Sequence, residues 1–258
     1  MWESIKLGAR SQYRRKRWSM VVVLGLLAVW EGYSRFLNTR GNTYFPSIEF
    51  TYRQTMANKD MIVDGILVTF SEAILAFVFA MIIGVALGVL ISEVATVRQM
   101  SMPVIVFVYS FPHAILAPLF IIWFGRGTMA VGLFGAWVAF FPVFINTLTG
   151  MSQTKEEFKY LGDVIGASRW QMLRYIKIWE ALPHIASSTR IAVQLSLVGV
   201  IIAEFLATGD GLGFLIVRAT QRAEIGFAFG TIIVIMLVAV AFYKIVSLAL
   251  DQVVSTYS

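Results

Sequence analysis

The sequence contains no cysteine and only two histidines, His113 and His184. The lack of cysteine excludes disulfide bonds, cysteine-ligated zinc, iron–sulfur clusters and thiol chemistry. Two histidines provide little material for a histidine-based metal site. We therefore expect this chain to bind no metal and no cofactor of its own.

The motifs of common nucleotide-binding and hydrolytic sites are also missing. No G-x-x-x-x-G-K-[ST] sequence occurs, so the chain has no phosphate-binding loop, and neither H-E-x-x-H nor G-x-S-x-G is present. A glycine cluster begins at Gly209, but it does not fit G-x-G-x-x-G and follows no strand. The sequence therefore indicates a chain that is neither an ATPase nor a hydrolase.

Charged residues are scarce. They make up 14% of the 258 residues, whereas 58% are hydrophobic, which is typical of a membrane protein. A helix needs about 20 apolar residues to cross roughly 30 Å of hydrocarbon. About six such stretches predict an all-α integral membrane domain over residues 18–258, after a basic segment at 1–17. The expected helices cover residues 18–37, 66–91, 103–124, 128–148, 185–206 and 227–250.

The distribution of basic residues predicts the orientation of these helices. Twelve lysines and arginines fall in one alternate set of connecting segments and six fall in the other. The first set comprises residues 1–17, 92–101 and 150–183, and the second comprises 38–65, 125–127 and 207–226. Because basic segments stay in the cytoplasm, we expect both termini to be cytoplasmic. The first apolar run is too long for a signal peptide and lacks a cleavage site, so we expect it to be retained.

Two helices carry further patterns. Small residues recur at every fourth position in the second helix, at Ala76, Ala80, Gly84, Gly88 and Ser92. Such a row lets another backbone approach closely in lipid, and it favours packing within the chain over a dimer contact. Prolines interrupt the third helix at positions 112 and 118, so we expect this helix to be kinked or broken.

Broken helices at membrane depth are tolerated where they face protein or a water-filled path. Polar and aromatic side chains at that depth are therefore candidates for a translocation pathway. These candidates are Tyr109, His113, Trp123, Asn146, Gln194 and Ser196. A lone histidine in such a place is also a common packing residue, so both interpretations of His113 stay open.

A polar stretch from Ser152 to Pro183 separates the fourth and fifth apolar runs. Apolar residues recur in it at steps of three and four: Phe158, Leu161 and Ile165, and then Trp170, Leu173 and Ile176. This is the period of a one-sided helix. Gly166 separates the two halves and Ser168 can cap the second. We predict two short amphipathic helices joined at a glycine elbow, with a helix lying on anionic lipid as the alternative.

A family resemblance lies in the run Gly166-Ala167-Ser168-Arg169-Trp170-Gln171, followed by Ala181-Leu182-Pro183. This run resembles the cytoplasmic EAA loop in permease subunits of ATP-binding-cassette (ABC) importers. It is most similar to the branch for nitrate, sulfonate, taurine and thiamine-precursor uptake. The Glu-Ala-Ala triplet of that pattern is absent, because Tyr160-Leu161-Gly162 stands in its place.

The resemblance implies a type I ABC importer fold, with a coupling loop at about 150–183, in a multi-pass protein of the bacterial plasma membrane. It implies a homodimer, two cytoplasmic ATPase subunits that use ATP and Mg²⁺, and an extracytoplasmic solute-binding protein. The chain would contact lipid, bind no nucleic acid and catalyse no reaction. The implied contacts to the ATPase come from Tyr160, Asp163, Gly166, Ala167, Ser168, Arg169 and Trp170.

A second site is implied between the fifth and sixth helices. Glu204 precedes the glycine cluster there, and glycine permits the positive-φ turns of a re-entrant loop. The resembled family has a Glu followed by Gly-Leu-Gly at this place. An outer gate or a contact to the binding protein is thus expected at Glu204, Asp210, Gly211 and Gly213. A capped, solvated loop is the alternative.

These features predict the permease subunit of an ATP-driven, binding-protein-dependent importer that works by alternating access. The expected solute is small and anionic or polar, such as nitrate, a sulfonate, taurine or a pyrimidine precursor. An ion-coupled secondary transporter is the alternative, although inverted repeats and paired midplane carboxylates are not apparent. A membrane enzyme would need a catalytic constellation that the sequence lacks.

Overall fold

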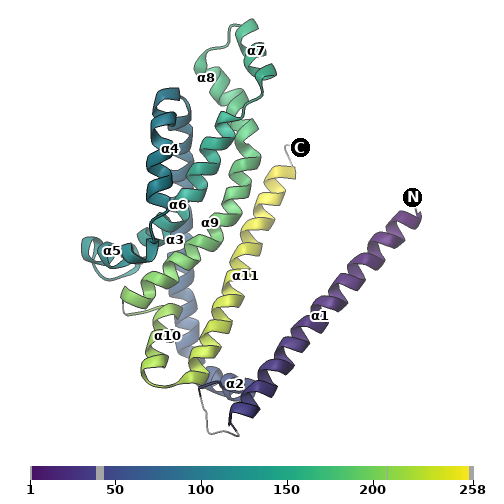
Figure 1. Ribbon diagram of the computed structural model, residues 1–258, viewed down its shortest axis with the longest axis vertical. Coiled ribbons are helices and arrows are strands. Elements are labelled where there is room, and N and C mark those ends of the chain that lie inside the picture. The colour runs from purple at the N-terminus through teal and green to yellow at the C-terminus, as the bar shows by residue number, and fades with distance from the viewer. Residues whose placement is uncertain (1, 39–43, 208, 256–258) are drawn as a thin grey trace. The chain divides into compact units, whose positions relative to one another are not determined.

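The computed structural model describes residues 2–38, 44–207 and 209–255, and all regular elements in these ranges are helices (Figure 1). The all-α fold expected from the sequence is therefore confirmed. The chain forms two compact units. One unit contains Met1–Lys59 and Ala219–Gly230, and the other contains Asp60–Arg218 and Thr231–Ser258. The basic side chains expected at positions 1–17 lie outside the described residues.

The first unit contains α1 (Trp2–Asn38) and α2 (Ile48–Ala57). The Nε1 atom of Trp30 donates a hydrogen bond to the Pro46 carbonyl at 2.8 Å, which fixes the chain that leads into α2. Ser47 caps α2 through a hydrogen bond from the Phe50 amide at 3.2 Å. The segment expected outside the membrane between the first two spans therefore contains a capped helix.

The second unit contains most of the remaining helices, and α10 and α11 extend across the boundary between the units. These helices are α3 (Lys59–Ser92), α4 (Ala95–Tyr109), the 3₁₀ turn η1 (His113–Leu116), α5 (Ala117–Phe124), α6 (Thr128–Ser152), α7 (Glu156–Val164), α8 (Arg169–Met172), the π turn η2 (Leu173–Lys177), α9 (Ile178–Ala207), α10 (Leu212–Gln221) and α11 (Ile225–Ser255). Figure 1 shows α7 and α8 beyond one end of α6 and α9.

The helices of the described residues account for five or six membrane spans. Five helices are long and apolar enough to cross a bilayer: Met20–Asn38, Lys59–Ser92, Thr128–Ser152, Arg169–Leu206 and Ile225–Gln252. A sixth span results if α4 and the η1–α5 segment are taken together, and these two halves meet at 82°. The broken third helix and the number of spans both agree with the sequence-based prediction.

The core of the second unit forms where α3, α6 and α9 approach one another closely. Ala76 and Ala80 on α3 are buried, and a Cβ atom at Gly84 would lie 2.8 Å from Val143 on α6. A Cβ atom at Gly199 on α9 would lie 2.8 Å from the Cα atom of Gly135 on α6. The row of small residues therefore packs within the chain, because no larger side chain fits between these helices.

Two segments are more helical than the sequence indicates. The α9 helix begins at Ile178 and continues through Pro183, where the sequence suggested the end of a loop. A Cβ atom at Gly150 of α6 would lie 3.2 Å from the Cα atom of Ala181, so tight packing holds this first turn. The expected turn after Glu204 is followed by the α10 helix, which begins at Leu212.

Candidate functional site

The first candidate site is the hairpin of residues 153–172, which connects α6 to α9. Its helix α7 ends at Val164, and Gly166, two residues further on, has a φ of +66°, in the left-handed region that favours glycine. The amide of Ala167 donates to the Gly162 carbonyl at 2.9 Å, and the amide of Gly166 donates to the Asp163 carbonyl at 3.2 Å. These two bonds form a Schellman motif, which ends a helix in a fixed direction. The predicted glycine elbow is therefore present at Gly166.

The second arm of the hairpin begins with a reciprocal cap. The Oγ atom of Ser168 accepts a hydrogen bond from the Gln171 amide at 3.3 Å. The Oε1 atom of Gln171 accepts one from the Ser168 amide at 2.8 Å. This capping box satisfies two amides that α8 would otherwise leave without a partner. The cap and the elbow together fix the direction in which the chain turns.

The two arms touch at Gly162 and Met172. Gly162 is buried, and any Cβ atom at this position would overlap the Sδ atom of Met172. A larger residue at this position would require the Met172 side chain or α7 to move. Gly162 is the last residue of the triplet that departs from the Glu-Ala-Ala pattern, and this contact gives the departure a structural reason.

The hairpin presents apolar side chains on its surface. Tyr160 is 73% exposed, Ile165 is 67% exposed and Trp170 is 64% exposed. Of the seven residues expected to contact an ATPase, six are exposed and Ala167 is half-buried. Exposed aromatic residues on a rigid support are typical of a binding surface. The expected contacts are thus accessible, and their role stays a prediction.

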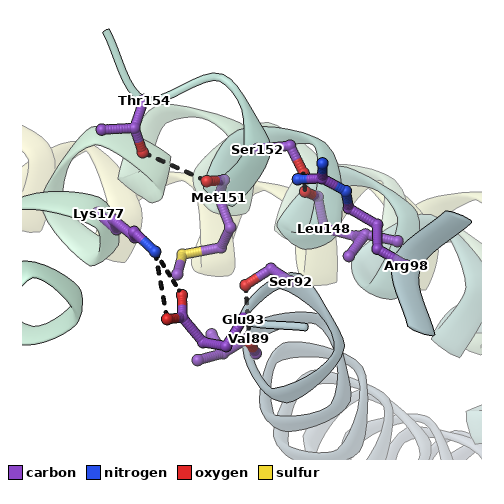
Figure 2. Close-up of polar contacts among 9 residues, drawn as sticks. All are labelled: Val89, Ser92, Glu93, Arg98, Leu148, Met151, Ser152, Thr154 and Lys177. Atoms are coloured by element: carbon purple, nitrogen blue, oxygen red, sulfur yellow. Dashed lines mark hydrogen bonds and ion pairs between the residues drawn. The ribbon is translucent and has the colours of Figure 1, made fainter. Parts of the chain in front are cut away.

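Polar bonds fix the base of the hairpin to the helices beside it (Figure 2). Thr154 is buried and its Oγ1 atom donates to the Met151 carbonyl at 3.3 Å. On the returning side, the Nζ atom of Lys177 lies 2.9 Å from Oε1 of Glu93. The amide of Lys155 donates to Oε2 of Glu180 at 2.9 Å, which joins the two sides of the hairpin. The hairpin is therefore held at its base as well as at its elbow.

The second candidate site surrounds the carboxylate of Glu204, at the other end of α9. Its Oε1 atom accepts a hydrogen bond from the Thr69 hydroxyl at 2.6 Å, and its Oε2 atom accepts one from the Gly213 amide at 2.6 Å. The Leu212 amide in turn donates to the Thr69 Oγ1 atom at 2.8 Å. Gly211 has a φ of +96°, and a Cβ atom there would overlap the Glu204 carboxylate. Glu204, Gly211 and Gly213 thus lie together, and their role in an outer gate or a binding-protein contact stays a prediction.

A cavity of about 220 Å³ lies beside this carboxylate. Glu72 on α3 lines it and is 3% exposed, and its Oε2 atom has no hydrogen-bond donor within the described part of the chain. Asp210 and Arg126 also line the cavity. Sequence reasoning placed no candidate at Thr69 or Glu72, because nothing local in the sequence shows that they approach Glu204.

The predicted pathway residues do not all come together. Tyr109 and His113 lie at the break after α4, with ring centroids 5.8 Å apart. Both rings pack on Phe141 of α6, at 5.7 and 5.5 Å. Trp123 packs on Phe120 within α5 at 5.9 Å. The break in the third span is therefore lined by aromatic rings from α4, η1 and α6.

The other pathway candidates use their polar atoms locally or lie on the surface. The Nδ2 atom of Asn146 donates to the Pro142 carbonyl at 2.8 Å. Ser196 is buried and its hydroxyl donates to the Val193 carbonyl at 3.0 Å. Gln194 is exposed on the surface of α9. In this structure the six candidates therefore do not form a single site.

Comparison with known proteins identifies a family. Residues 76–256 match the family model described as "binding-protein-dependent transport system inner membrane component". The chain is 24% identical to a probable ABC transporter permease protein of Haemophilus influenzae, over 87% of this chain and 91% of that protein. It is 25% identical to the formylaminopyrimidine transport permease protein ThiX of Halalkalibacterium halodurans, over 84% and 86% of the two chains.

A solved structure shares the fold. One chain from an inward-facing structure of the MetNI methionine ABC transporter superposes with a TM-score of 0.66 at 18% identity. The match covers 78% of this chain and 98% of that chain. The type I ABC importer fold predicted from the sequence is therefore confirmed.

Proposed function

The chain belongs to the family of binding-protein-dependent transport system inner membrane components, and we propose that it transmits force from a cytoplasmic ATPase to a solute gate. It is the permease subunit of an ABC importer for small solutes. In our proposal two copies enclose the pathway, and each hairpin docks on one of two ATPase subunits. A binding protein delivers the solute on the opposite side of the membrane.

The exposed apolar surface of the hairpin is the observation that carries this proposal. Tyr160, Ile165 and Trp170 are largely exposed on a short helix pair whose direction is fixed by the Schellman motif and the capping box. Such a surface fits a groove in a partner protein. A rigid hairpin is required, because a flexible one would not pass the movement of the ATPase to the helices.

The mechanism that follows is a change in the populations of two states. Closure of the ATPases around ATP moves the two hairpins, and α9 and α6 follow because the hairpin is continuous with both. Nucleotide binding changes the populations of the inward-open and outward-open states only to the extent that the nucleotide binds one state more tightly than the other. The chain itself hydrolyses nothing in this scheme, and ATP and Mg²⁺ stay on the partner subunit.

We infer that the solute is a small polar molecule. The cavity beside Glu204 is lined by three carboxyl groups, from Glu72, Glu204 and Asp210, and by one guanidinium, from Arg126. Carboxyl groups together with a guanidinium can hydrogen-bond a polar solute. Relatives of this chain are named for the transport of formylaminopyrimidine and of taurine, and both names fit a small polar solute.

Reconstitution tests the proposal. The permease is coexpressed with a candidate ATPase subunit and a candidate solute-binding protein, purified in nanodiscs, and assayed for ATP hydrolysis with and without loaded binding protein. We expect the ATPase to copurify and to be stimulated, and the change Trp170→Ala to weaken copurification while the permease still inserts. Uptake by the permease alone, driven by an ion gradient and needing no ATPase, would instead support a secondary transporter.

A further inference from the structure

The short connection between α3 and α4 contacts both sides of the hairpin base (Figure 2). Glu93 lies in this connection and Arg98 lies in the first turn of α4. Glu93 binds Lys177 on the side where the chain returns from the hairpin. Arg98 binds Ser152 on the side where the chain enters it. The connection and the first turn of α4 together therefore contact both sides of the loop.

The contact on the returning side is a partly buried ion pair. The Nζ atom of Lys177 lies 2.9 Å from Oε1 and 3.2 Å from Oε2 of Glu93, and both side chains are about one quarter exposed. Surface ion pairs contribute little, because water and salt screen them. Reduced exposure weakens that screening. Lys177 also closes the π turn η2, and such turns are frequent at functional positions.

The contact on the entering side runs through a hydroxyl. The Nη1 atom of Arg98 donates to the Ser152 Oγ atom at 3.1 Å, and this hydroxyl donates to the Leu148 carbonyl at 2.6 Å. The last turn of α6 is thereby tied to the first turn of α4. A movement of either side of the hairpin must carry the base of α4 with it or break one of these bonds.

The α4 helix leads from these contacts to the break in the third span. It has 15 residues, which corresponds to about 22 Å of helix, with Pro103 inside it. At its far end the chain bends by 82°, and the rings of Tyr109 and His113 pack on Phe141. Displacement of the base of α4 therefore reaches the aromatic break without passing through α9.

We propose that Glu93 and Arg98 are positioning residues that transmit the movement of the hairpin to α4, and that α4 opens and closes the break in the third span. This inference rests on the proposed function, since it requires that an ATPase moves the hairpin. The loop would then move helices by two routes. The α6 and α9 helices move because they are continuous with the loop, and α4 moves because these two contacts hold it.

Charge exchange tests the proposal in the assembled transporter. The variants Glu93→Lys, Lys177→Glu and the double exchange are compared for the number of ATP molecules hydrolysed per solute imported. We expect each single variant to raise this ratio by about tenfold and the double exchange to return it to within about threefold of the original, as coupled pairs do. Copurification of the ATPase is expected to stay unchanged in all three, because none of these side chains lies on the exposed hairpin surface.

A second ion pair on α9 provides the matched control. Arg190 and Asp251 pair at 2.6 Å between α9 and α11, away from the hairpin. Reversing Arg190 to Asp is expected to leave the ratio of ATP to solute unchanged. If this reversal uncouples transport as strongly as Glu93→Lys does, general disturbance of α9 explains the effect and the proposal is wrong.

The remaining outcomes are also decisive. A Glu93→Lys variant with an unchanged ratio would overturn the inference, and so would a double exchange that is no better coupled than the single variants. If Glu93→Lys does not fold, the neutral change Glu93→Gln makes the same test, with a raised ratio expected and an unchanged one contradicting the proposal. If the ATPase fails to copurify with the unaltered permease, the proposed function fails and not this inference alone.

Discussion

The Thr69 hydroxyl donates a hydrogen bond to Oε1 of Glu204 at 2.6 Å, although 135 positions separate the two residues. The same hydroxyl accepts from the Leu212 amide, and Glu204 accepts from the Gly213 amide. Thr69 on α3 and Glu204 on α9 therefore hold the start of α10 between them. Each donor or acceptor in this network is the hydrogen-bond partner of another buried group, so the loss of one leaves a second group without a hydrogen bond.

The change Thr69→Val tests the strength of this network. Valine keeps the shape of threonine but cannot donate to Glu204 or accept from the Leu212 amide. We expect the free energy of unfolding in mild detergent to fall by about 2 kcal/mol. Ser71→Ala is the control on the same helix, because the Ser71 hydroxyl is exposed and bonds only to the local Val68 carbonyl. Equal stability of the two variants would show that the network contributes little.

The change Gly211→Ala tests the close fit of the glycine turn around Glu204. Gly211 has a positive φ, and a methyl group there would overlap the Glu204 carboxylate. Gly125 also has a positive φ, of +80°, but has no atom within 4 Å of its Cβ position. Gly125 has a ψ of 177°, in a region that is essentially restricted to glycine, so its alanine variant carries a backbone strain of about 1–3 kcal/mol without any steric contact.

The difference between these two variants isolates the contact. We expect Gly211→Ala to lower the thermal unfolding midpoint further than Gly125→Ala, because it also displaces the carboxylate from its donors. The measurement is thermal unfolding of the purified permease in detergent. A Gly211→Ala variant as stable as the unaltered permease would contradict the geometry at Gly211.

The change Glu72→Gln tests the buried oxygen beside Glu204. Glu72 lies beside the Glu204 carboxyl and its Oε2 atom has no partner within the described residues. A glutamine at this position is neutral, so it removes the repulsion between two carboxylates, and its amide can donate to a Glu204 oxygen. We expect the variant to be more stable, by about 1 kcal/mol. Glu204→Gln is the contrasting variant and is expected to be less stable, because its amide group cannot accept from both donors. Stability changes of the opposite sign would contradict this assignment of donors and acceptors.

The change Gly162→Ala tests the contact between the arms of the hairpin. The added methyl group overlaps Met172, so the Met172 side chain or α7 must move, and we expect the exposed surface to change shape. We expect affinity for the ATPase to fall by about tenfold while the permease itself stays as stable, since the hairpin is peripheral. Adding Met172→Ala removes the overlap and is expected to restore part of the affinity. An unaffected Gly162→Ala variant would show that the spacing of the arms does not matter.

Much of the hairpin could be predicted from the sequence because its contacts are local. The elbow at Gly166 and the cap between Ser168 and Gln171 join residues only a few positions apart. The row of small residues on α3 is likewise visible as a period. These features depend on chain geometry and on residues within one or two helical turns.

The contacts that join distant helices gave no such signal. The Lys177–Glu93 pair spans 84 positions. Glu93 follows an apolar run and Lys177 is one of five basic residues in the segment 150–183, so neither residue stands out in the sequence. The α10 helix was also missed, because the glycines at 209–213 suggested a turn. Leu212 and Leu215 are buried at a helical spacing, and their packing forms a helix where the composition indicated a loop.

Site-specific photocrosslinking tests the docking of the hairpin most directly. Because the chain has no cysteine, a single cysteine at Tyr160, Ile165 or Trp170 can carry a benzophenone label without further changes. A label at Phe107, which is 78% exposed on α4, serves as the control. The account predicts that the three hairpin labels capture the ATPase subunit in the assembled transporter and that the Phe107 label does not. Capture of lipid alone by all four labels would contradict it.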